Sequence, residues 1–310
     1  MAKRRKSKKE QTVIRNIFVI AVIIIALLYF LDSQGILKYD TIQTGLGLRD
    51  GASSDAEVSV HYIDVGQGDC ELILIEKSVI LIDAGEAQYG EKVVSYLKAQ
   101  GVTRLDYVIA THPHSDHIGG MTEVLKTFEV DTLYMPLIPD EMVPTGYSYE
   151  NFLTAMIEKN VNFVELDSEE KLSINGVSVE IYPPVEEYNN LNNYSLITRM
   201  THGSNTFLFT GDAEKQAENA LLKSKIEVSA MVYKAGHHGS NTSSNEDFLK
   251  AVMPQICIIS CGAGNSYNHP GDKAVERISK YAEVILRTDI SGTIVIESDG
   301  KSVSYKVEKG

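Results

Sequence analysis

The order of apolar segments in this 310-residue chain predicts an α/β fold in which two packed sheets carry helices on their outer faces. Short strand-like runs come first, strand and helix patterns then alternate, and strand–helix units return near the end of the chain. Polar residues of metal-ligand type stand directly after several strands, which is where α/β proteins place their chemistry. The length and the 43% hydrophobic content suit one large domain or two small ones.

Hydrophobic periodicity defines the expected elements in order. Short apolar or β-branched runs predict strands over residues 57–65, 70–75, 79–83, 105–110, 177–182, 195–200, 206–210, 230–233, 255–260, 283–286 and 293–297. Apolar residues at helical spacing predict helices over residues 91–100, 118–128, 149–159, 214–222, 245–252 and 273–281. Residues 57–310 are therefore expected to form the folded domain.

The amino terminus predicts a membrane anchor. Residues 13–31 are an apolar run interrupted only by Arg15 and Asn16, close to the ~20 residues that span a bilayer. The basic tail of residues 1–12 precedes it, so the positive-inside rule places the domain outside the cell on a single-pass helix. A cleaved signal peptide, and hence a secreted protein, is the alternative, although small residues for a cleavage site are scarce after Leu31. The glycines and serines of residues 32–56 predict a flexible linker.

The charge distribution argues against non-specific binding of duplex nucleic acid. The chain carries a net charge of −13, and residues 1–15 contribute +6 to it, so residues 16–310 carry −19. Affinity for duplex DNA comes from lysines and arginines that neutralise phosphates. In residues 16–310 acidic side chains outnumber these basic ones. A nucleic acid held by metal ions in a cleft remains compatible with this charge. The three cysteines do not form a disulfide framework.

A histidine-rich segment follows the predicted strand 105–110. It reads Thr-His-Pro-His-Ser-Asp-His-Ile-Gly-Gly and places four ligand-type side chains within six residues, namely His112, His114, Asp116 and His117. Imidazole and carboxylate groups suit zinc, manganese or iron. The alternative is a solvated loop, which would explain one histidine more readily than four residues at this spacing. The segment therefore predicts a metal site.

Three further strand ends carry ligand-type residues. Asp83 ends the strand in Leu-Ile-Asp-Ala-Gly, Asp212 follows Leu-Phe-Thr-Gly, and His237 and His238 follow Tyr-Lys-Ala-Gly. Taken singly, Asp83 could belong to a turn, Asp212 could cap a helix, and the histidine pair could lie in a surface loop. Their common position after apolar strands favours convergence on one site.

These motifs resemble the metallo-β-lactamase superfamily of hydrolases over roughly residues 57–300. The segment His112 to His117 matches its His-x-His-x-Asp-His signature. Within the superfamily the chain is most similar to the extracellular hydrolase domain of ComEC-type competence proteins. The supporting strings are Asp-Val-Gly-Gln-Gly-Asp (64–69), Asn-Asn-Tyr-Ser-Leu (192–196), Phe-Thr-Gly-Asp-Ala-Glu (209–214), Lys-Ala-Gly-His-His-Gly-Ser (234–240) and Asn-His-Pro (268–270). The polytopic channel of a full competence protein is absent from this sequence.

The resemblance implies a four-layer αββα sandwich with two divalent metal ions, zinc or manganese, in a cleft between the sheets. The implied ligands of the first ion are His112, His114 and a shared Asp212; those of the second are Asp116, His117, His237 and the same Asp212. Asp116, His237 and His238 are the implied catalytic residues. The first ion normally has a further histidine, where this chain offers Asn193. His202 lies nearby in the sequence and is expected to be a turn residue. Side chains expected to orient ligands or to contact substrate are Asp83, Asn193, Lys234, Ser240 and His269.

The expected function is metal-dependent hydrolysis of a phosphodiester, with DNA or its fragments as substrate. A phosphorylcholine-esterase-like hydrolase of cell-surface phosphodiesters is the first alternative, and a tethered, non-catalytic binding module is the second. β-Lactam hydrolysis fits the ligand pattern less well. No protein partner can be inferred. The Gly-rich turn of residues 64–69 suggests that Asp69 matters for stability or substrate access more than for metal affinity.

Overall fold

The computed structural model describes residues 48–50 and 57–309. Contacts divide the chain into Met1–Asp50 and Gly51–Gly310. The first part contributes only the short strand β1 (Leu48–Asp50) to the described residues. The second part, Gly51–Gly310, holds the other described strands and the helices.

The first sheet of this part is mixed. In spatial order it runs β16-β15-β2-β3-β4-β5-β6-β7. Strands β15, β16, β2, β3 and β4 pair antiparallel, whereas β4, β5, β6 and β7 pair parallel. The bounds are Val58–Tyr62 (β2), Glu71–Ile75 (β3), Ser78–Ile82 (β4), Arg104–Ile109 (β5), Glu129–Pro136 (β6), Asn162–Leu166 (β7), Ile294–Ser298 (β15) and Val303–Val307 (β16).

The second sheet runs β14-β13-β12-β11-β10-β9-β8. Strands β8 to β11 form an antiparallel meander, and β11 to β14 are parallel. The bounds are Glu170–Ile174 (β8), Val177–Tyr182 (β9), Ile197–His202 (β10), Asn205–Phe209 (β11), Val232–Lys234 (β12), Ile256–Ile259 (β13) and Val284–Arg287 (β14). Because β4 with β5, and β11 with β12 and β13, are parallel, the carboxyl ends of these neighbours share one edge of their sheet.

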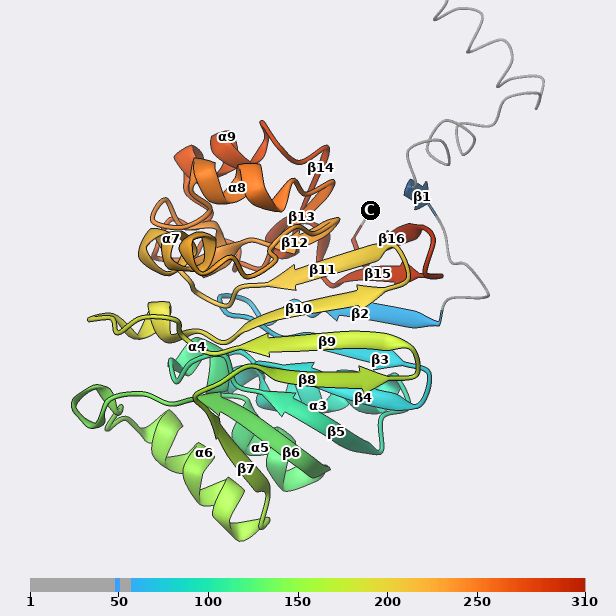
Figure 1. Ribbon diagram of the computed structural model, residues 1–310. Coiled ribbons are helices and arrows are strands. Elements are labelled where there is room, and N and C mark those ends of the chain that lie inside the picture. Colours follow the sequence, from blue (N-terminus) through green and yellow to red (C-terminus); the bar gives the residue numbers. More distant parts are fainter. Residues whose placement is uncertain (1–47, 51–56, 310) are drawn as a thin grey trace, which may run out of the picture. The chain divides into compact units, whose positions relative to one another are not determined.

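Helices cover the outer face of each sheet (Figure 1). Three of them pack on the first sheet, namely α3 (Gly90–Ala99), α5 (Met121–Thr127) and α6 (Tyr147–Glu158). Three others pack on the second sheet, namely α7 (Lys215–Ser224), α8 (Glu246–Val252) and α9 (Asp272–Ile278). The single turns α4 (Ser115–Ile118) and α10 (Thr288–Ser291) complete the helices.

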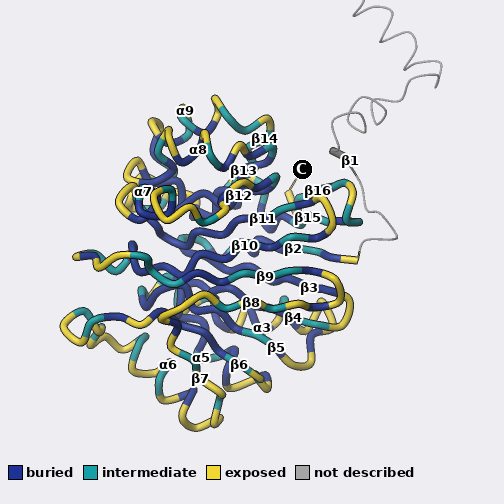
Figure 2. Tube along the Cα trace, viewed as in Figure 1, coloured by how far each residue is buried: buried dark blue, intermediate teal, exposed yellow. Residues whose placement is uncertain are grey.

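Alternation along the strands explains why two sheets pack together. In β3, Leu72 joins the helix-facing core, while its neighbour Ile73 is equally buried and points to the other face. In β11, Leu208 faces the helices, and Phe209 points the opposite way and stacks on Tyr62 of the first sheet at 6.0 Å between ring centroids. Strands buried on both faces therefore occupy the middle of the domain (Figure 2). The expected pair of packed sheets with outer helices is confirmed.

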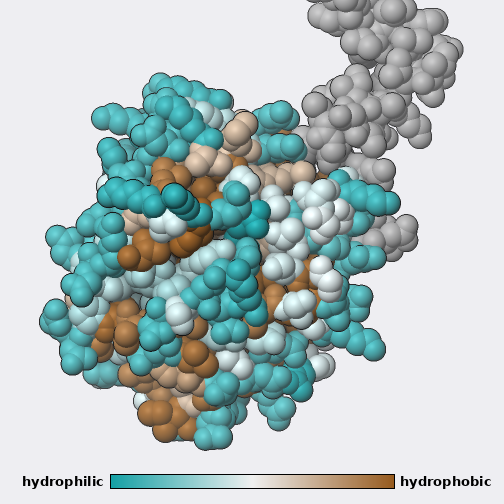
Figure 3. Space-filling view, in the orientation of Figure 1, coloured by the Kyte–Doolittle hydropathy of each residue, from teal (hydrophilic) through white to brown (hydrophobic). Residues whose placement is uncertain are grey.

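The predicted transmembrane helix is not supported by the structure. Within residues 48–50 and 57–309, no helix is long and apolar enough to cross a membrane. Helix α6 has 12 residues, whereas a helix that crosses a bilayer needs ~20. The expected span of residues 13–31 and most of the expected linker lie outside the described residues. The single-pass localisation inferred from that span therefore has no structural support. Hydrophilic side chains cover much of the face seen in Figure 3.

Several strands escaped the sequence analysis. Strands β6, β7, β8 and β16 were not expected, because their burial is uneven or one face is exposed. The helix expected over 118–128 is divided, with α4 ending at Ile118 and α5 beginning at Met121. Gly119 and Gly120 lie between them, where a Cβ on Gly120 would stand 2.2 Å from the carbonyl oxygen of Ala84. The backbone therefore needs glycine at this close approach.

Candidate metal centre

The polar residues that follow the parallel strands meet at one place. Asp83 follows β4, the histidine segment follows β5, Asp212 follows β11, and the turn Gly236–Gly239 follows β12. Parallel neighbours end at the same edge of a sheet, so each loop delivers its side chains to the same cleft. The carboxyl edge of each sheet thus contributes to one site between the two sheets.

One group of potential ligands consists of His112, His114 and Asp212, whose ligand atoms lie within 4.8 Å of one another. His112 Nε2 lies 2.9 Å from His114 Nδ1 and 3.8 Å from Asp212 Oδ2. His112 and Asp212 are buried, whereas His114 is partly exposed toward the cleft. The arrangement is a three-residue donor set open on one side.

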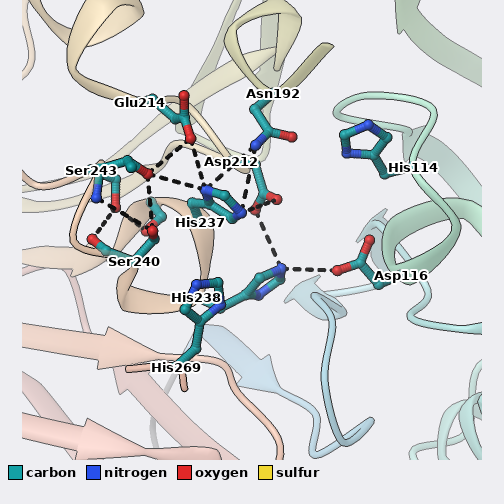
Figure 4. A network of polar contacts seen from close by, with 12 residues as sticks. His114, Asp116, Asn192, Asp212, Glu214, His237, His238, Ser240, Ser243 and His269 are labelled. Atoms are coloured by element: carbon teal, nitrogen blue, oxygen red, sulfur yellow. Dashed lines mark hydrogen bonds and ion pairs between the residues drawn. The ribbon is translucent and has the colours of Figure 1, made fainter. Parts of the chain in front are cut away.

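The second group consists of Asp116, His117, Asp212 and His238, again within 4.8 Å of one another. His238 Nε2 lies 3.1 Å from Asp116 Oδ2 and 3.4 Å from Asp212 Oδ1, as Figure 4 shows. His117 Nε2 lies 3.2 Å from the same Asp212 oxygen. Asp212 therefore belongs to both groups, with one carboxylate oxygen directed toward each.

Further side chains hold the imidazoles in place. Asp83 Oδ2 lies 2.7 Å from His117 Nδ1, and the same carboxylate accepts hydrogen bonds from the backbone and hydroxyl of Thr111 at 2.9 and 2.6 Å. Because Nδ1 of His117 is occupied, its Nε2 is directed to the centre of the site. Asp83 is thus placed to orient the ring of His117.

A second orienting pair comes from segments distant in sequence. Asp69 Oδ1 lies 3.1 Å from His238 Nδ1, and its other oxygen forms an ion pair with Lys234. Asp69 and Lys234 are each only 1% exposed. His238 Nδ1 also lies 3.1 Å from the carbonyl oxygen of Ser260. The Nε2 atom of His238 is therefore left free to face Asp116 and Asp212.

The carboxylates set the proton affinities of this centre. Burial alone would lower the pKa of His117, but Asp212 and Asp83 raise it well above its usual value. Burial likewise opposes protonation of His238, yet Asp212 and Asp69 raise its pKa to about 10. Asp116 is partly buried, and this burial would raise its pKa, but the neighbouring His117 and His238 hold that pKa below its usual range. A field that favours positive charge on imidazoles also attracts a divalent cation.

Unsatisfied buried atoms test whether metal ions fit. Among the described residues, His117 Nε2 and Asp212 Oδ1 are buried and make no hydrogen bond, although they lie 3.2 Å apart. Buried polar atoms of native proteins nearly always have a partner. Both atoms are of ligand type and face the second group, so a cation would satisfy them. The donor set of imidazole nitrogens and carboxylate oxygens matches zinc or manganese chemistry.

The structure exchanges the roles expected for the two adjacent histidines. His238, rather than His237, belongs to the second ligand group. His237 is 21% exposed, with Nδ1 3.2 Å from Glu214 Oε1 and Nε2 3.7 Å from Asp212 Oδ2. Both histidines have positive φ, 48° and 53°, so the backbone turns sharply at each residue. Such left-handed residues cost about 1–3 kcal/mol each and concentrate at functional sites.

The two adjacent asparagines are exchanged in the same way. Asn193 Oδ1 accepts hydrogen bonds from the amides of Glu214 and Ala217 at 3.0 and 3.3 Å, which caps the start of α7. It is therefore not placed to replace the missing histidine. Asn192 lines the cleft, with Nδ2 3.4 Å from His237 Nδ1 and a buried Oδ1 that makes no hydrogen bond.

Of the other residues expected at the site, one lines the cleft and the others lie away from it. His269 lines the cleft, and burial together with His237 and His238 lowers its pKa to about 4, so it is neutral at pH 7. Lys234 is buried against Asp69 and does not line the cleft, and the Ser240 hydroxyl bonds Thr242 at 2.9 Å. His202, expected in a turn, is the last residue of β10, and its Nδ1 lies 2.8 Å from Ser298 Oγ, outside the ligand groups.

The cleft itself has a volume of about 310 Å³. Its lining includes members of both ligand groups, namely His114, Asp116, Asp212 and His238. It also includes residues that the sequence analysis did not select, namely Gln67, Ser115, Asn192 and Tyr267. Gln67 belongs to the Asp-Val-Gly-Gln-Gly-Asp string, which was the one sequence signal for it. Tyr267 lies two residues before His269 and carried no periodic signal.

Comparison with known proteins agrees with this geometry. A family profile described as Metallo-beta-lactamase superfamily matches residues 63–262. ComE operon protein 3 of Bacillus subtilis (strain 168) is 33% identical over 78% of this chain and 33% of its own length. Competence protein ComA of Neisseria gonorrhoeae is 32% identical over 79% of this chain and 33% of its own length. Recombination protein 2 of Haemophilus influenzae is 29% identical over 76% and 28%. The chain thus spans about a third of the length of these relatives.

Solved structures agree at the level of the fold. The metallo-beta-lactamase fold protein YhfI from Bacillus subtilis superposes with a TM-score of 0.52 at 14% identity, over 78% of this chain and all of the other. Igni18, a metallo hydrolase from Ignicoccus hospitalis KIN4/I, superposes with a TM-score of 0.50 at 13% identity, over 78% of this chain and all of the other. The family match covers most of the described domain, and the resemblance inferred from the motifs is confirmed: this chain belongs to the metallo-beta-lactamase superfamily, with relatives among competence proteins.

Proposed function

We propose that this chain is a two-metal phosphodiesterase that acts on DNA or its fragments. The observation that carries the proposal is the position of Asp212, whose carboxylate belongs to both ligand groups. Two cations that share one carboxylate lie close together, which is the arrangement used for in-line displacement at phosphorus. His112 and His114 would hold one ion with Asp212, and Asp116, His117 and His238 would hold the other with it.

The reaction is hydrolysis of one ester bond. The oxygen of a water molecule forms a bond to phosphorus while a P–O ester bond breaks, and the products are a phosphomonoester and an alcohol. The proton of the water ends on the departing oxygen. Bound divalent ions would lower the pKa of the water and stabilise negative charge on the phosphoryl oxygens.

The chain's own residues would orient the ligands and the substrate. Asp83 fixes the ring of His117, and Asp69 fixes the ring of His238, so neither imidazole can rotate away from the centre. Asn192 and His237 lie at the cleft and offer hydrogen bonds to phosphoryl oxygens. His269 is neutral at pH 7 because its pKa is lowered to about 4, so it serves as a hydrogen-bonding group rather than as an acid.

The relatives support nucleic acid as the substrate class. One of them is named as a competence protein and another as a recombination protein, and we take DNA as the substrate class from these names. The chain spans only about a third of their length, so transport of DNA is not part of the proposal. The acidic composition of the body favours a substrate held by metal ions over one held by a basic surface.

Metal analysis and diester hydrolysis test the proposal on the full chain. We expect about two zinc or manganese ions per chain and turnover of bis(p-nitrophenyl) phosphate. His114→Ala and Asp116→Ala should each abolish turnover with an unchanged far-UV circular dichroism spectrum, because each removes a ligand from a different group. Single-stranded DNA should compete with the chromogenic substrate.

A matched control distinguishes loss of a ligand from loss of any carboxylate. Asp140 is exposed, lies outside both ligand groups and does not line the cleft, so Asp140→Ala should keep full activity. Less than one metal ion per chain together with no turnover would favour the binding-module alternative. Competition by choline phosphodiesters and not by DNA would favour the phosphorylcholine-esterase alternative.

A further inference from the structure

A tyrosine stands exposed at the mouth of the metal cleft. Tyr267 is 66% exposed and lines the same cleft as Asp116, Asp212 and His238. A single exposed aromatic residue is common on protein surfaces and needs no explanation by itself. Tyr267 differs because its ring is stacked, its loop is braced, and its neighbours lead directly to the metal ligands.

The ring of Tyr267 continues a series of aromatic contacts that begins at the metal centre. It stacks on His269 with 5.8 Å between ring centroids and an interplanar angle of 24°. His269 in turn lies 6.0 Å from His238 at 32° and 5.1 Å from His237 at 75°. Figure 4 shows His269 beside His238. One face of Tyr267 is therefore used internally, and the ring extends the series to the solvent.

The loop that carries Tyr267 is held by one side chain. Asn265 Oδ1 accepts hydrogen bonds from the amides of Tyr267 and His269 at 3.1 and 3.0 Å. Its Nδ2 donates to the carbonyl oxygens of Gly262 and His269 at 2.8 and 2.5 Å. These four hydrogen bonds from the Asn265 side chain fix the backbone on both sides of Tyr267. The exposed ring is thus pre-positioned, which lowers the entropy lost when a ligand stacks on it.

Gln67 ties the same loop to the first sheet's side of the cleft. Its Oε1 accepts a hydrogen bond from the Gly262 amide at 3.2 Å, and its Nε2 lies 3.4 Å from His269 Nδ1. Gln67 itself lines the cleft. The aromatic pair therefore keeps a fixed position relative to residues 64–69, and through Asp69 relative to His238.

The charges around the loop show which kind of contact is available to a substrate. On its far side lies a second cavity of about 610 Å³ that shares His269 with the metal cleft. Arg287 in this cavity is already paired with Asp289 at 2.7 and 2.9 Å, and Asp272 offsets Lys273. With no excess of positive charge there, a phosphate chain gains little by Coulomb attraction. Stacking on the exposed ring of Tyr267 is a contact that this side of the cleft does offer.

We infer that Tyr267 and His269 form a stacking platform for a nucleobase of the substrate, next to the phosphate that is cleaved. The inference rests on the proposed phosphodiesterase function and adds its substrate class. Bases stack on tyrosine largely without regard to sequence, because each has a π-face. A quaternary ammonium group would require an aromatic cage, whereas the cleft offers one tyrosine and no tryptophan.

Three substrates with the same leaving group test the platform. They are the p-nitrophenyl ester of thymidine 5′-phosphate, methyl p-nitrophenyl phosphate, and p-nitrophenylphosphorylcholine. For Tyr267→Ala we expect kcat/KM to fall about 10-fold or more with the thymidine ester and to stay within about twofold with the methyl ester. Tyr267→Phe should keep wild-type values, because the ring and not the hydroxyl stacks. Tyr147→Ala removes an exposed tyrosine that does not line the cleft, and it should change nothing.

A binding measurement separates failure of this inference from failure of the proposed function. Fluorescein-labelled oligothymidylate and an abasic oligomer of equal length, both with cleavage-resistant phosphorothioate linkages, are compared by anisotropy on the metal-loaded chain. Wild type should bind oligothymidylate about 10-fold more tightly than the abasic oligomer, and Tyr267→Ala should remove this difference. If wild type hydrolyses no ester, the proposed function fails, and this comparison still decides the platform.

Four results would overturn the inference. The first is an equal loss of activity by Tyr267→Ala with the methyl and thymidine esters, which would indicate a structural role. The second is unchanged activity with the thymidine ester. The third is equal binding of the abasic and thymidine oligomers, and the fourth is a Tyr267-dependent preference for p-nitrophenylphosphorylcholine.

Discussion

The buried ion pair behind His238 gives the most demanding prediction. Asp69 and Lys234 lie 165 residues apart in sequence, each is 1% exposed, and Asp69 joins the Lys234 ammonium to the His238 ring. Replacing Asp69 by asparagine keeps the volume and removes the charge. The Lys234 ammonium then stays buried without its carboxylate, and breaking such a buried pair costs about 3–5 kcal/mol.

A buried glutamate near Asp69 places the expected loss of unfolding free energy at the lower end of that range. Glu71 is buried close by, and burial, with the charge of Asp69, raises its pKa well above the usual value. Once the Asp69 charge is removed, Glu71 ionises more readily and partly compensates Lys234. We therefore expect Asp69→Asn to lower the free energy of unfolding by about 3 kcal/mol at pH 7.

A double-mutant cycle isolates the pair. Urea unfolding of the full chain, followed by far-UV circular dichroism, is measured for wild type, Asp69→Asn, Lys234→Met and the double variant. Because the double variant leaves no unpaired charge, its loss should be smaller than the sum of the single losses by about 3 kcal/mol. The exposed pair Glu123–Lys126 is the control, and its coupling should stay below about 1 kcal/mol. Additive losses at Asp69 and Lys234 would refute the reasoning.

Zinc affinity separates the two contacts of Asp69. Asp69→Asn also replaces the carboxylate that orients His238 with a neutral amide, and mutation of such a partner typically weakens metal binding 10–100-fold, about 1.4–2.7 kcal/mol. Lys234→Met keeps that carboxylate, so it should weaken zinc binding less than Asp69→Asn when both are measured by chelator competition. The sequence analysis expected Asp69 to affect stability or access more than metal affinity; the contact with His238 predicts an effect on both.

Three further predictions concern pH, a helix cap and a glycine. Burial lowers the pKa of His61 from 6.5 to about 4, so the unfolded chain binds more protons than the folded chain between these pH values. The free energy of unfolding should therefore fall by about 2 kcal/mol as the pH is lowered from 7.5 to 5. His61→Gln should reduce this fall in urea titrations, and an unchanged fall would assign it to other groups. Asn193→Ala should lower stability by about 1–2 kcal/mol through loss of the α7 cap and leave zinc affinity unchanged, so a large loss of zinc would restore Asn193 as a ligand. Gly68 has φ +138°, and a Cβ there would lie 2.3 Å from the carbonyl oxygen of Asp116; Gly68→Ala should therefore lower both thermal stability and zinc affinity, whereas Gly101→Ala, with φ +79° and open space, should lower stability alone by about 1 kcal/mol. Equal zinc affinities for the two alanine variants would contradict the close approach.

The sequence by itself determined the pair of sheets and the loops that carry the chemistry. Strands such as β5 and β11 are short apolar runs, so their hydrophobicity alone identifies them in the sequence. Asp83, Asp212 and the histidine segment follow strands of this kind. Because parallel neighbours end on one edge, ligand types at strand ends predict a shared site without any knowledge of contacts. The less apolar strands β7 and β8 could not be found this way, since their exposed residues remove the periodic signal.

Only the tertiary structure decided which neighbour in each loop faces the cleft. His237 and His238 have the same chemistry and both have positive φ, and Asn192 and Asn193 occupy one tight turn. A strand fixes the direction of each side chain by its period of two, but a turn has no such period, so a difference of one residue stays undetermined until the loop packs. The same holds for Asp69, whose partners Lys234 and His238 come from another sheet's strand and the turn after it. Local sequence selects which residue types could bind a metal, and long-range packing selects which of these side chains come together in the cleft.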